Sequence, residues 1–214
     1  MLDPPVDVRY AAASIRYRME NPLKRSRARL KPRDWIAAGL ARLGTQGVDS
    51  VRVEVLARDL GISKGSFYWH FPDRSDLLEQ MLSQWERGEL DWLAPDQDGD
   101  EGAASRWARL VNRTANPRRM QIELALREWA RRDERVARRL ALVEGRKAAF
   151  IAGVLREVGF QGSSAESWSE VVLLVSLGWL DRATRDPEFQ LANRGLGDFL
   201  SELVLAASGR PPTG

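Results

Sequence analysis

The segment Leu56–Phe71 constrains the fold of this chain more than any other part of the sequence. It predicts two short helices joined by a tight turn, because Gly61 suits the positive-φ residue that ends one helix and Ser63 suits the N-cap of the next. Ala57 is small enough for another helix to cross close above it. The apolar residues fall at positions that face inward: Leu56, Leu60, Ile62, Phe67 and Phe71. This pattern is typical of a helix-turn-helix.

The second helix of this motif carries polar and aromatic side chains on its outward side. These residues are Lys64, Ser66, Tyr68, Trp69 and His70. In a helix-turn-helix the second helix enters the major groove of DNA, so the pattern favours double-stranded DNA as a partner. The alternative is a pair of helices that only packs a core. Such a pair has no need of three ring-bearing side chains on its outward side.

The same segment resembles a known family. The residues that carry the resemblance are Ser63–Phe71, then Pro72, Asp73, Arg74, Leu77 and Leu78. They resemble the signature of the TetR family of bacterial transcriptional regulators, over residues 35–80. The resemblance implies an all-α fold, with a three-helix DNA-binding head at the N-terminus and a helical body for effector binding and dimerisation.

Carried over residue by residue, the resemblance implies one DNA-binding set. It comprises Arg52, Ser63, Lys64, Gly65, Ser66, Tyr68, Trp69, His70 and Arg74. Lys64 lies where base edges are usually reached, and lysine can donate to guanine O6 or N7. Gly65 permits close approach of the backbone, and Tyr68 resembles a phosphate clamp of the family. Arg74 stands where relatives often carry a phosphate-contacting lysine.

Some of these roles have alternatives. Trp69 could lie partly buried against the first helix, and His70 could be a helix C-cap or a phosphate clamp. The Ser or Thr that caps the second helix in the family is absent here, and Glu54 follows. A phosphate contact from that helix would therefore depend on the charge of Arg52.

Composition excludes several other classes of protein. The chain has no cysteine and one histidine, which excludes disulfides and thiolate chemistry and argues against a histidine metal site or a catalytic triad. Residues 96–101 are acidic, but a calcium-binding loop that began at residue 96 would need Gly in sixth place and a carboxylate in twelfth. Here Gly is fourth and the twelfth residue is Trp107, so the segment does not fit such a loop. We therefore expect no enzyme activity, no cofactor and no metal.

The basic residues gather near the N-terminus. Residues 16–33 hold eight basic side chains and one acidic side chain, Glu20, as expected beside a DNA-binding head. We expect residues 1–30 to form a disordered basic arm, and Met19 could be an alternative start. No stretch of about 18 apolar residues and no apolar signal-peptide core is present. We therefore expect a cytoplasmic protein with no membrane partner.

Helical patterns interrupted by breakers predict the remaining organisation. We expect the first helix from Pro32 to Leu43, broken by Gly44 and Gly47, and the second and third from about Val53 and Ser63. A fourth helix, opened by a capping Asp73 with Asp76 in a capping box, should run towards Pro95. Further helices are expected near 103–114, 118–131, 134–158, 164–184 and 193–207. The domains would be a DNA-binding head over 31–78, a body over 79–208 and a tail over 209–214.

The resemblance also implies a small-molecule site and a dimer interface in the body. The candidate pocket residues are Met81, Trp85, Trp107, Trp129 and Phe150, with Arg127, Glu128 or Glu144 as a polar anchor. The candidate interface residues are Leu173, Leu177, Trp179, Leu200 and Leu203. The alternative for both sets is ordinary core packing within one monomer.

The predicted function is a TetR-type transcriptional regulator acting as a repressor. It would bind a palindromic operator as a homodimer and be released by a small-molecule effector of unknown identity. The alternative is a DNA-binding regulator without a small-molecule ligand, controlled by a protein partner. An enzyme with a vestigial head finds no support, because the chain has no nucleophile–base pair, phosphate loop or metal cluster.

Overall fold

The computed structural model describes residues 30–94, 102–114, 116–186, 188–189 and 195–207. Every regular element within these ranges is a helix, and they contain no strand. The all-α prediction is therefore confirmed. The predicted arm, apart from Leu30, the acidic run 96–101 and the tail 209–214 lie outside the described residues.

The head is built from four short elements. They are α2 (Pro32–Gln46), the 3₁₀ helix η2 (Val48–Ser50), α3 (Val53–Asp59) and the 3₁₀ helix η3 (Lys64–Trp69). Gly61 has φ 69°, as the turn between α3 and η3 requires. Ser63 occupies the predicted cap position with an extended backbone, but its side chain makes no capping hydrogen bond. The second helix of the motif is thus a 3₁₀ helix without the expected hydroxyl cap.

Helix α2 runs through Gly44, where the sequence predicts a break. It ends two residues later, at Gln46, just before Gly47, whose φ is 75°. A Cβ atom placed on Gly44 would lie 3.1 Å from Cγ1 of Ile122, in helix α6 (Pro117–Ala130). Gly44 therefore serves the close crossing of α2 and α6, and the predicted break there is wrong.

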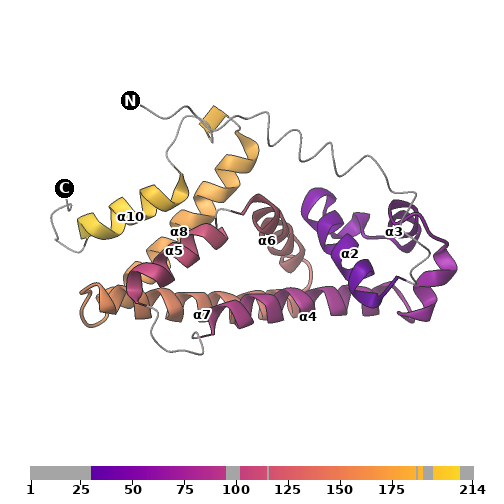
Figure 1. Ribbon diagram of the computed structural model, residues 1–214, viewed down its shortest axis with the longest axis horizontal. Helices are drawn as coiled ribbons and strands as arrows, with labels where there is room; N and C mark the ends of the chain where they lie inside the picture. The colour runs from indigo at the N-terminus through magenta and orange to yellow at the C-terminus, as the bar shows by residue number, and fades with distance from the viewer. Residues whose placement is uncertain (1–29, 95–101, 115, 187, 190–194, 208–214) are drawn as a thin grey trace, which may run out of the picture. The chain divides into compact units, whose positions relative to one another are not determined.

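Helix α4 (Arg74–Leu93) leads from the head into the body (Figure 1). Asp73 caps it as predicted, and its carboxylate accepts a hydrogen bond from the backbone N–H of Asp76 at 2.9 Å. The side chain of Asp76 accepts from Gln80 one turn later, at 2.9 Å. The carboxylate of Asp76 is therefore engaged along the helix, and the capping box expected there is not among its hydrogen bonds.

The other body helices begin and end close to the predicted breakers. Helices α5 (Ala103–Thr114), α7 (Glu134–Glu157), α8 (Ser164–Arg185) and α10 (Leu196–Ala207) accompany α6. Helix α6 packs on α2, and α7 packs on both α4 and α8 (Figure 1). None of the helices in the described ranges is long and apolar enough to cross a membrane.

Two apolar cores hold these helices. The first joins the head to α4, α6 and α7, so that Trp35 and Leu56 of the head share a core with Leu126 and Val136 of the body. The second lies among α5, α7, α8 and α10 around Ile151. Because fully burying one large apolar side chain contributes about 1.5–3 kcal/mol, the shared core couples the head firmly to α4.

Candidate functional site

The outward side of η3 presents large rings to solvent. Tyr68 is 54% exposed and Trp69 is 77% exposed, while Phe67 of η3 is fully buried. The ring of Phe67 meets Trp35 edge-on at 5.2 Å between centroids and stacks on Phe71 at 5.1 Å. The exposure of Trp69 excludes the alternative of partial burial against the first helix. A rigid aromatic base thus holds an exposed polar and aromatic surface.

Lys64 lies at the start of this surface and forms an ion pair with Glu54 of α3. Hydrogen bonding to Lys64 lowers the pKa of the Glu54 carboxyl, and the same bond raises the pKa of the Lys64 ammonium. Both groups are exposed, so the pair is worth little in stability. The ammonium can therefore exchange Glu54 for another acceptor at small cost.

The other predicted DNA-binding residues differ in what they contact. Arg74 donates from Nε to the carbonyl of Val51 at 2.6 Å and from Nη2 to the carbonyl of Val48 at 2.7 Å. These bonds hold the loop before α3, so Arg74 has a structural task besides any phosphate contact. Arg52 is exposed and donates from Nε to the carbonyl of Asp49 at 3.0 Å.

The small residues and the histidine complete the set. Ser63 and Gly65 are exposed, and Ser66 and His70 are half-buried. A Cβ atom on Gly65 would meet only the Oγ atom of Ser63, at 3.8 Å. His70 stands at the C-cap position of η3, where its backbone N–H bonds the carbonyl of Phe67. The structure thus places eight of the nine predicted residues in the head and Arg74 at the start of α4.

The five predicted pocket residues do not surround one cavity. Met81, Trp85 and Trp129 belong to the core shared by head and body. Trp107 and Phe150 pack on the second core, and the Trp107 indole donates to Oγ of Ser201 at 2.9 Å. These aromatic side chains therefore pack in or against the two apolar cores, which is the alternative that the sequence left open.

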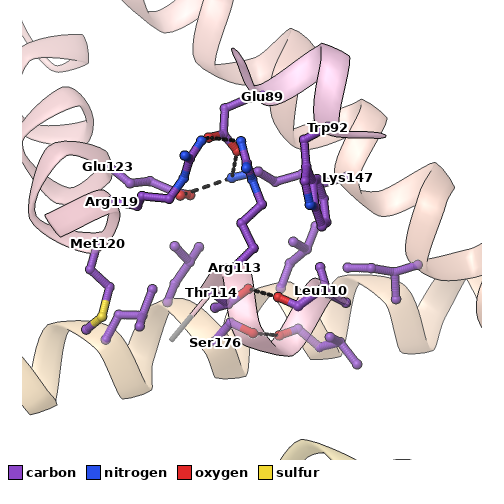
Figure 2. A pocket seen from close by; sticks show the side chains of 15 residues that line it. Glu89, Trp92, Leu110, Arg113, Thr114, Arg119, Met120, Glu123, Lys147 and Ser176 are labelled. Carbon is purple, nitrogen blue, oxygen red and sulfur yellow. Dashed lines mark hydrogen bonds and ion pairs between the residues drawn. The ribbon is translucent and has the colours of Figure 1, made fainter. Parts of the chain in front are cut away.

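A different set of residues lines a cavity of about 50 Å³ between α4, α5, α6, α7 and α8 (Figure 2). The apolar residues of its lining, which we call the floor, are Leu110, Met120, Ile151, Val172, Leu173, Leu177 and Leu180, and the hydroxyl-bearing Thr114 and Ser176 also line the cavity. Its roof carries the charged residues Glu89, Arg113, Arg119, Glu123 and Lys147, with Trp92 beside them. The cavity thus joins a hydrocarbon surface to a buried cluster of charges.

Glu89 is the centre of this charged roof (Figure 2). Its carboxylate accepts from Nη2 of Arg113 at 2.9 Å and Nη2 of Arg119 at 2.6 Å, and Nζ of Lys147 lies 3.3 Å away. Burial alone would raise the pKa of Glu89, but Lys147, Arg119 and Arg113 outweigh that effect and hold its pKa below the ordinary value. Burial is also the main reason that the pKa of Arg113 lies below its ordinary value.

Sequence reasoning missed these residues, although one signal was present. Glu89 follows Trp85 by one helical turn and precedes Trp92 by another, so it is an acid on the inward stripe of α4. A buried acid needs basic partners, and α5, α6 and α7 each supply one.

The predicted interface residues are divided between the inside and the edge of the body. Leu173 and Leu177 line the cavity, and Leu200 is buried within the chain. Leu203 is half-buried, and the half-buried Trp179 packs against Phe189 and Phe199. The exposed apolar side chains nearby are instead Val171, Leu174 and Phe199.

The fold and the head surface define a class: helix-turn-helix proteins with a helical body. Residues 36–81 match the family described as bacterial regulatory proteins of the tetR family. Over 48 residues the chain is 42% identical to the HTH-type transcriptional regulator AcrR of Shigella flexneri, and this match covers 22% of each protein. Residues 36–81 therefore form a domain of the tetR-family type.

Solved structures extend the likeness of the fold to the body. A transcriptional regulator from Rhodococcus sp. Rha1 matches with TM-score 0.65 and 18% identity, over 85% of this chain and 100% of that one. A regulator from Saccharomonospora viridis, in complex with choline, matches with TM-score 0.65 and 18% identity, over 82% of this chain and 93% of that one. At such identity the likeness concerns the fold alone.

Proposed function

We propose that this chain is a TetR-type transcriptional regulator, a repressor that binds a palindromic operator in double-stranded DNA as a homodimer. The observation that carries the proposal is the exposure of Lys64, Tyr68 and Trp69 above the buried Phe67. Residues 31–78 would bind DNA, and residues 79–208 would dimerise and hold an effector. The two η3 segments of the dimer would enter successive major grooves about 34–36 Å apart.

The proposed dimer would form through α8 and α10. Val171 and Leu174 of α8 and Phe199 of α10 are large apolar residues exposed to solvent. A second copy of the chain would cover them about a two-fold axis, and a two-fold protein suits a palindromic site. Leu203 and Trp179 lie beside these residues and would be at the edge of the same interface.

The proposed effector would bind the body cavity and release the operator. The support is the cavity itself, which reaches α4 through Glu89 and Trp92, and α4 continues from the head. A structural neighbour of the same fold is described in complex with choline, a small molecule.

A second candidate is a regulator controlled by a protein partner, without a small-molecule ligand. The cavity volume of about 50 Å³ favours it, because one water needs roughly 10–15 Å³ of such space and only a few waters would fit. Binding of a ligand in the cavity would decide between the two candidates.

The test is selection of DNA from a random pool by the purified chain, followed by footprinting and sedimentation. We expect a symmetric footprint and a mass twice that of one chain. A monomer at micromolar concentration that protects no DNA would contradict the proposal.

A further inference from the structure

The roof of the body cavity has more hydrogen-bond donors than acceptors. We propose that the effector is an amphipathic monoanion, with an apolar body on the cavity floor and one carboxylate at the roof. This inference rests on the proposed function, because it names the chemical class of the proposed effector.

The acids of the roof are already fully occupied. Oε1 of Glu89 accepts from Arg113 and Arg119, and Oε2 lies 3.3 Å from Nζ of Lys147. The same Nζ donates to Oε2 of Glu123 at 3.0 Å. The remaining Oε1 of Glu123 accepts from Nη2 of Arg127 at 3.0 Å. Neither carboxylate therefore has an oxygen without a partner for a cationic ligand.

In contrast, Arg113 of the roof and Arg127, which pairs with Glu123 beside the roof, each have a donor to spare. The Nε atoms of Arg113 and Arg127 are buried and have no hydrogen-bond partner among the described residues. A buried N–H group without an acceptor has lost its hydrogen bond to water and gained none in the protein, which is unfavourable and more so when the group is charged. A ligand that supplies acceptor oxygens would remove this cost at Arg113, which lines the cavity.

The charge of the cluster points to the same class of ligand. Four basic residues are linked by ion pairs to three acidic ones, so one positive charge is in excess. The basic residues are Arg113, Arg119, Arg127 and Lys147, and the acidic ones are Glu89, Glu123 and Glu144. An excess charge at a largely buried site is unfavourable unless it is paired. One carboxylate would neutralise it.

The aromatic side chain of the roof is not free to bind a cation. The guanidinium carbon of Arg113 lies 4.7 Å from the ring centroid of Trp92, and that of Arg109 lies 5.4 Å from it. A quaternary ammonium would need such a ring face for itself. Both the acids and the ring therefore disfavour a cation.

The apolar floor selects the rest of the ligand and links it to α4. The cavity is small, so a ligand of ten or so heavy atoms would have to widen it by displacing its walls. A ligand carboxylate beside Arg113 would compete with Glu89 for the guanidinium. It would thereby weaken the hydrogen bond from Arg113 of α5 to Glu89 of α4. Ligand binding and the position of α4 would thereby be coupled.

The test uses three probes with one skeleton: 4-phenylbutyrate, 4-phenylbutan-1-ol and 4-phenylbutylammonium. Each is titrated into the full-length protein by calorimetry, with tryptophan fluorescence as a second readout near Trp92. We expect the carboxylate to bind at least about tenfold more tightly than either analogue, as a buried charge-assisted hydrogen bond implies.

Three variants locate the site. Arg113→Gln should remove the preference for the carboxylate, and Glu89 keeps Arg119 and Lys147 as partners in that variant. Leu177→Trp should fill the floor and abolish binding of all three probes. Arg118→Gln is the matched control, because Arg118 lines an open groove between α2, α4 and α6 and not the cavity. Circular dichroism and the unfolding temperature establish that each variant is folded.

Several outcomes would overturn the inference. They are equal or tighter binding of the ammonium, no binding of any probe at millimolar concentration, or loss of binding in Arg118→Gln with retention in Arg113→Gln. Operator binding is measured separately in the same samples. If the carboxylate binds the cavity but operator affinity does not change, the ligand class is supported and the proposed release mechanism fails.

Discussion

At the scale of single residues, Gly65 has room for a methyl group in the free protein. Its backbone has no positive φ, and an added Cβ would lie 3.8 Å from the nearest atom that it could meet, Oγ of Ser63. We expect Gly65→Ala to leave the free energy of unfolding unchanged or raise it by about 0.4–1 kcal/mol. Operator affinity should fall, because the methyl group would keep the backbone away from DNA.

Equilibrium unfolding and operator titration measure the two effects. The matched control is Gly61→Ala, where φ is 69°, so alanine should destabilise the fold by about 1 kcal/mol or more. Full operator affinity in Gly65→Ala would show that DNA does not approach this part of η3.

Glu54 is the second informative residue, because it holds Lys64 when DNA is absent. Glu54→Gln should strengthen operator binding, since it frees the ammonium and removes a negative charge facing phosphate. The control is Glu166→Gln on α8, which makes the same charge change at a body ion pair with Arg156. Weaker binding in Glu54→Gln would mean that Glu54 orients Lys64 for DNA.

At the scale of elements, the ion pairs that join α4 to α5, α6 and α7 depend on the charge of Glu89. Because its pKa is lowered on folding, Glu89 stabilises the protein above its unfolded pKa near 4.5, and this contribution disappears as pH falls through the lower folded value. Glu89→Gln should cost about 3 kcal/mol at pH 7, since it leaves Arg113, Arg119 and Lys147 short of a partner.

Thermal unfolding from pH 7 down to pH 3 measures this effect. The difference between wild type and Glu89→Gln should begin to shrink below the unfolded pKa near 4.5, as the pH falls towards the lower folded pKa of Glu89. The control Glu128→Gln, at an exposed ion pair on α6, should cost almost nothing at any pH. A constant difference across the range would contradict the linkage to Glu89.

The face of α8 provides the prediction for assembly. Leu174 is 66% exposed, and Leu174→Arg should give monomers that bind the operator weakly, because the proposed interface would bury an unpaired charge. Leu142→Arg on α7, where the leucine is 45% exposed, is the matched control and should stay dimeric. Sedimentation measures the mass of each variant. A Leu174→Arg variant that stays dimeric would show that the dimer interface does not include Leu174.

Elements could be predicted from the sequence far better than the cavity. The Asn116-Pro117 step marks the start of α6, and Gly159, with φ 112°, follows the end of α7, because these residues act locally. The helix break predicted at Gly44 was wrong, because Gly44 lies within α2 and allows close contact with Ile122 of α6. The charged roof depends on four helices meeting, and only Glu89 on the inward side of α4 hinted at it.

At the scale of the whole molecule, we expect the basic side chains of the head and of the N-terminal arm to determine together how operator binding depends on salt concentration. Residues 24–33 carry six basic side chains directly before and into α2. An extended chain spans at most about 3.3–3.6 Å per residue, so this segment could follow the phosphate backbone or enter the neighbouring minor groove. We expect two or three of these charges per subunit to meet phosphate.

Deleting residues 1–29 should therefore flatten the salt dependence of operator binding. Each neutralised phosphate contributes about 0.9 to the slope of log affinity against log salt concentration, so a dimer should lose roughly 3–5. Sequence preference should change little, because phosphate contacts carry no sequence information. Deleting only residues 1–18 is the matched control, since that part holds three arginines against two acids and should alter the slope much less. An unchanged slope in the longer deletion would leave the head alone responsible for the phosphate contacts.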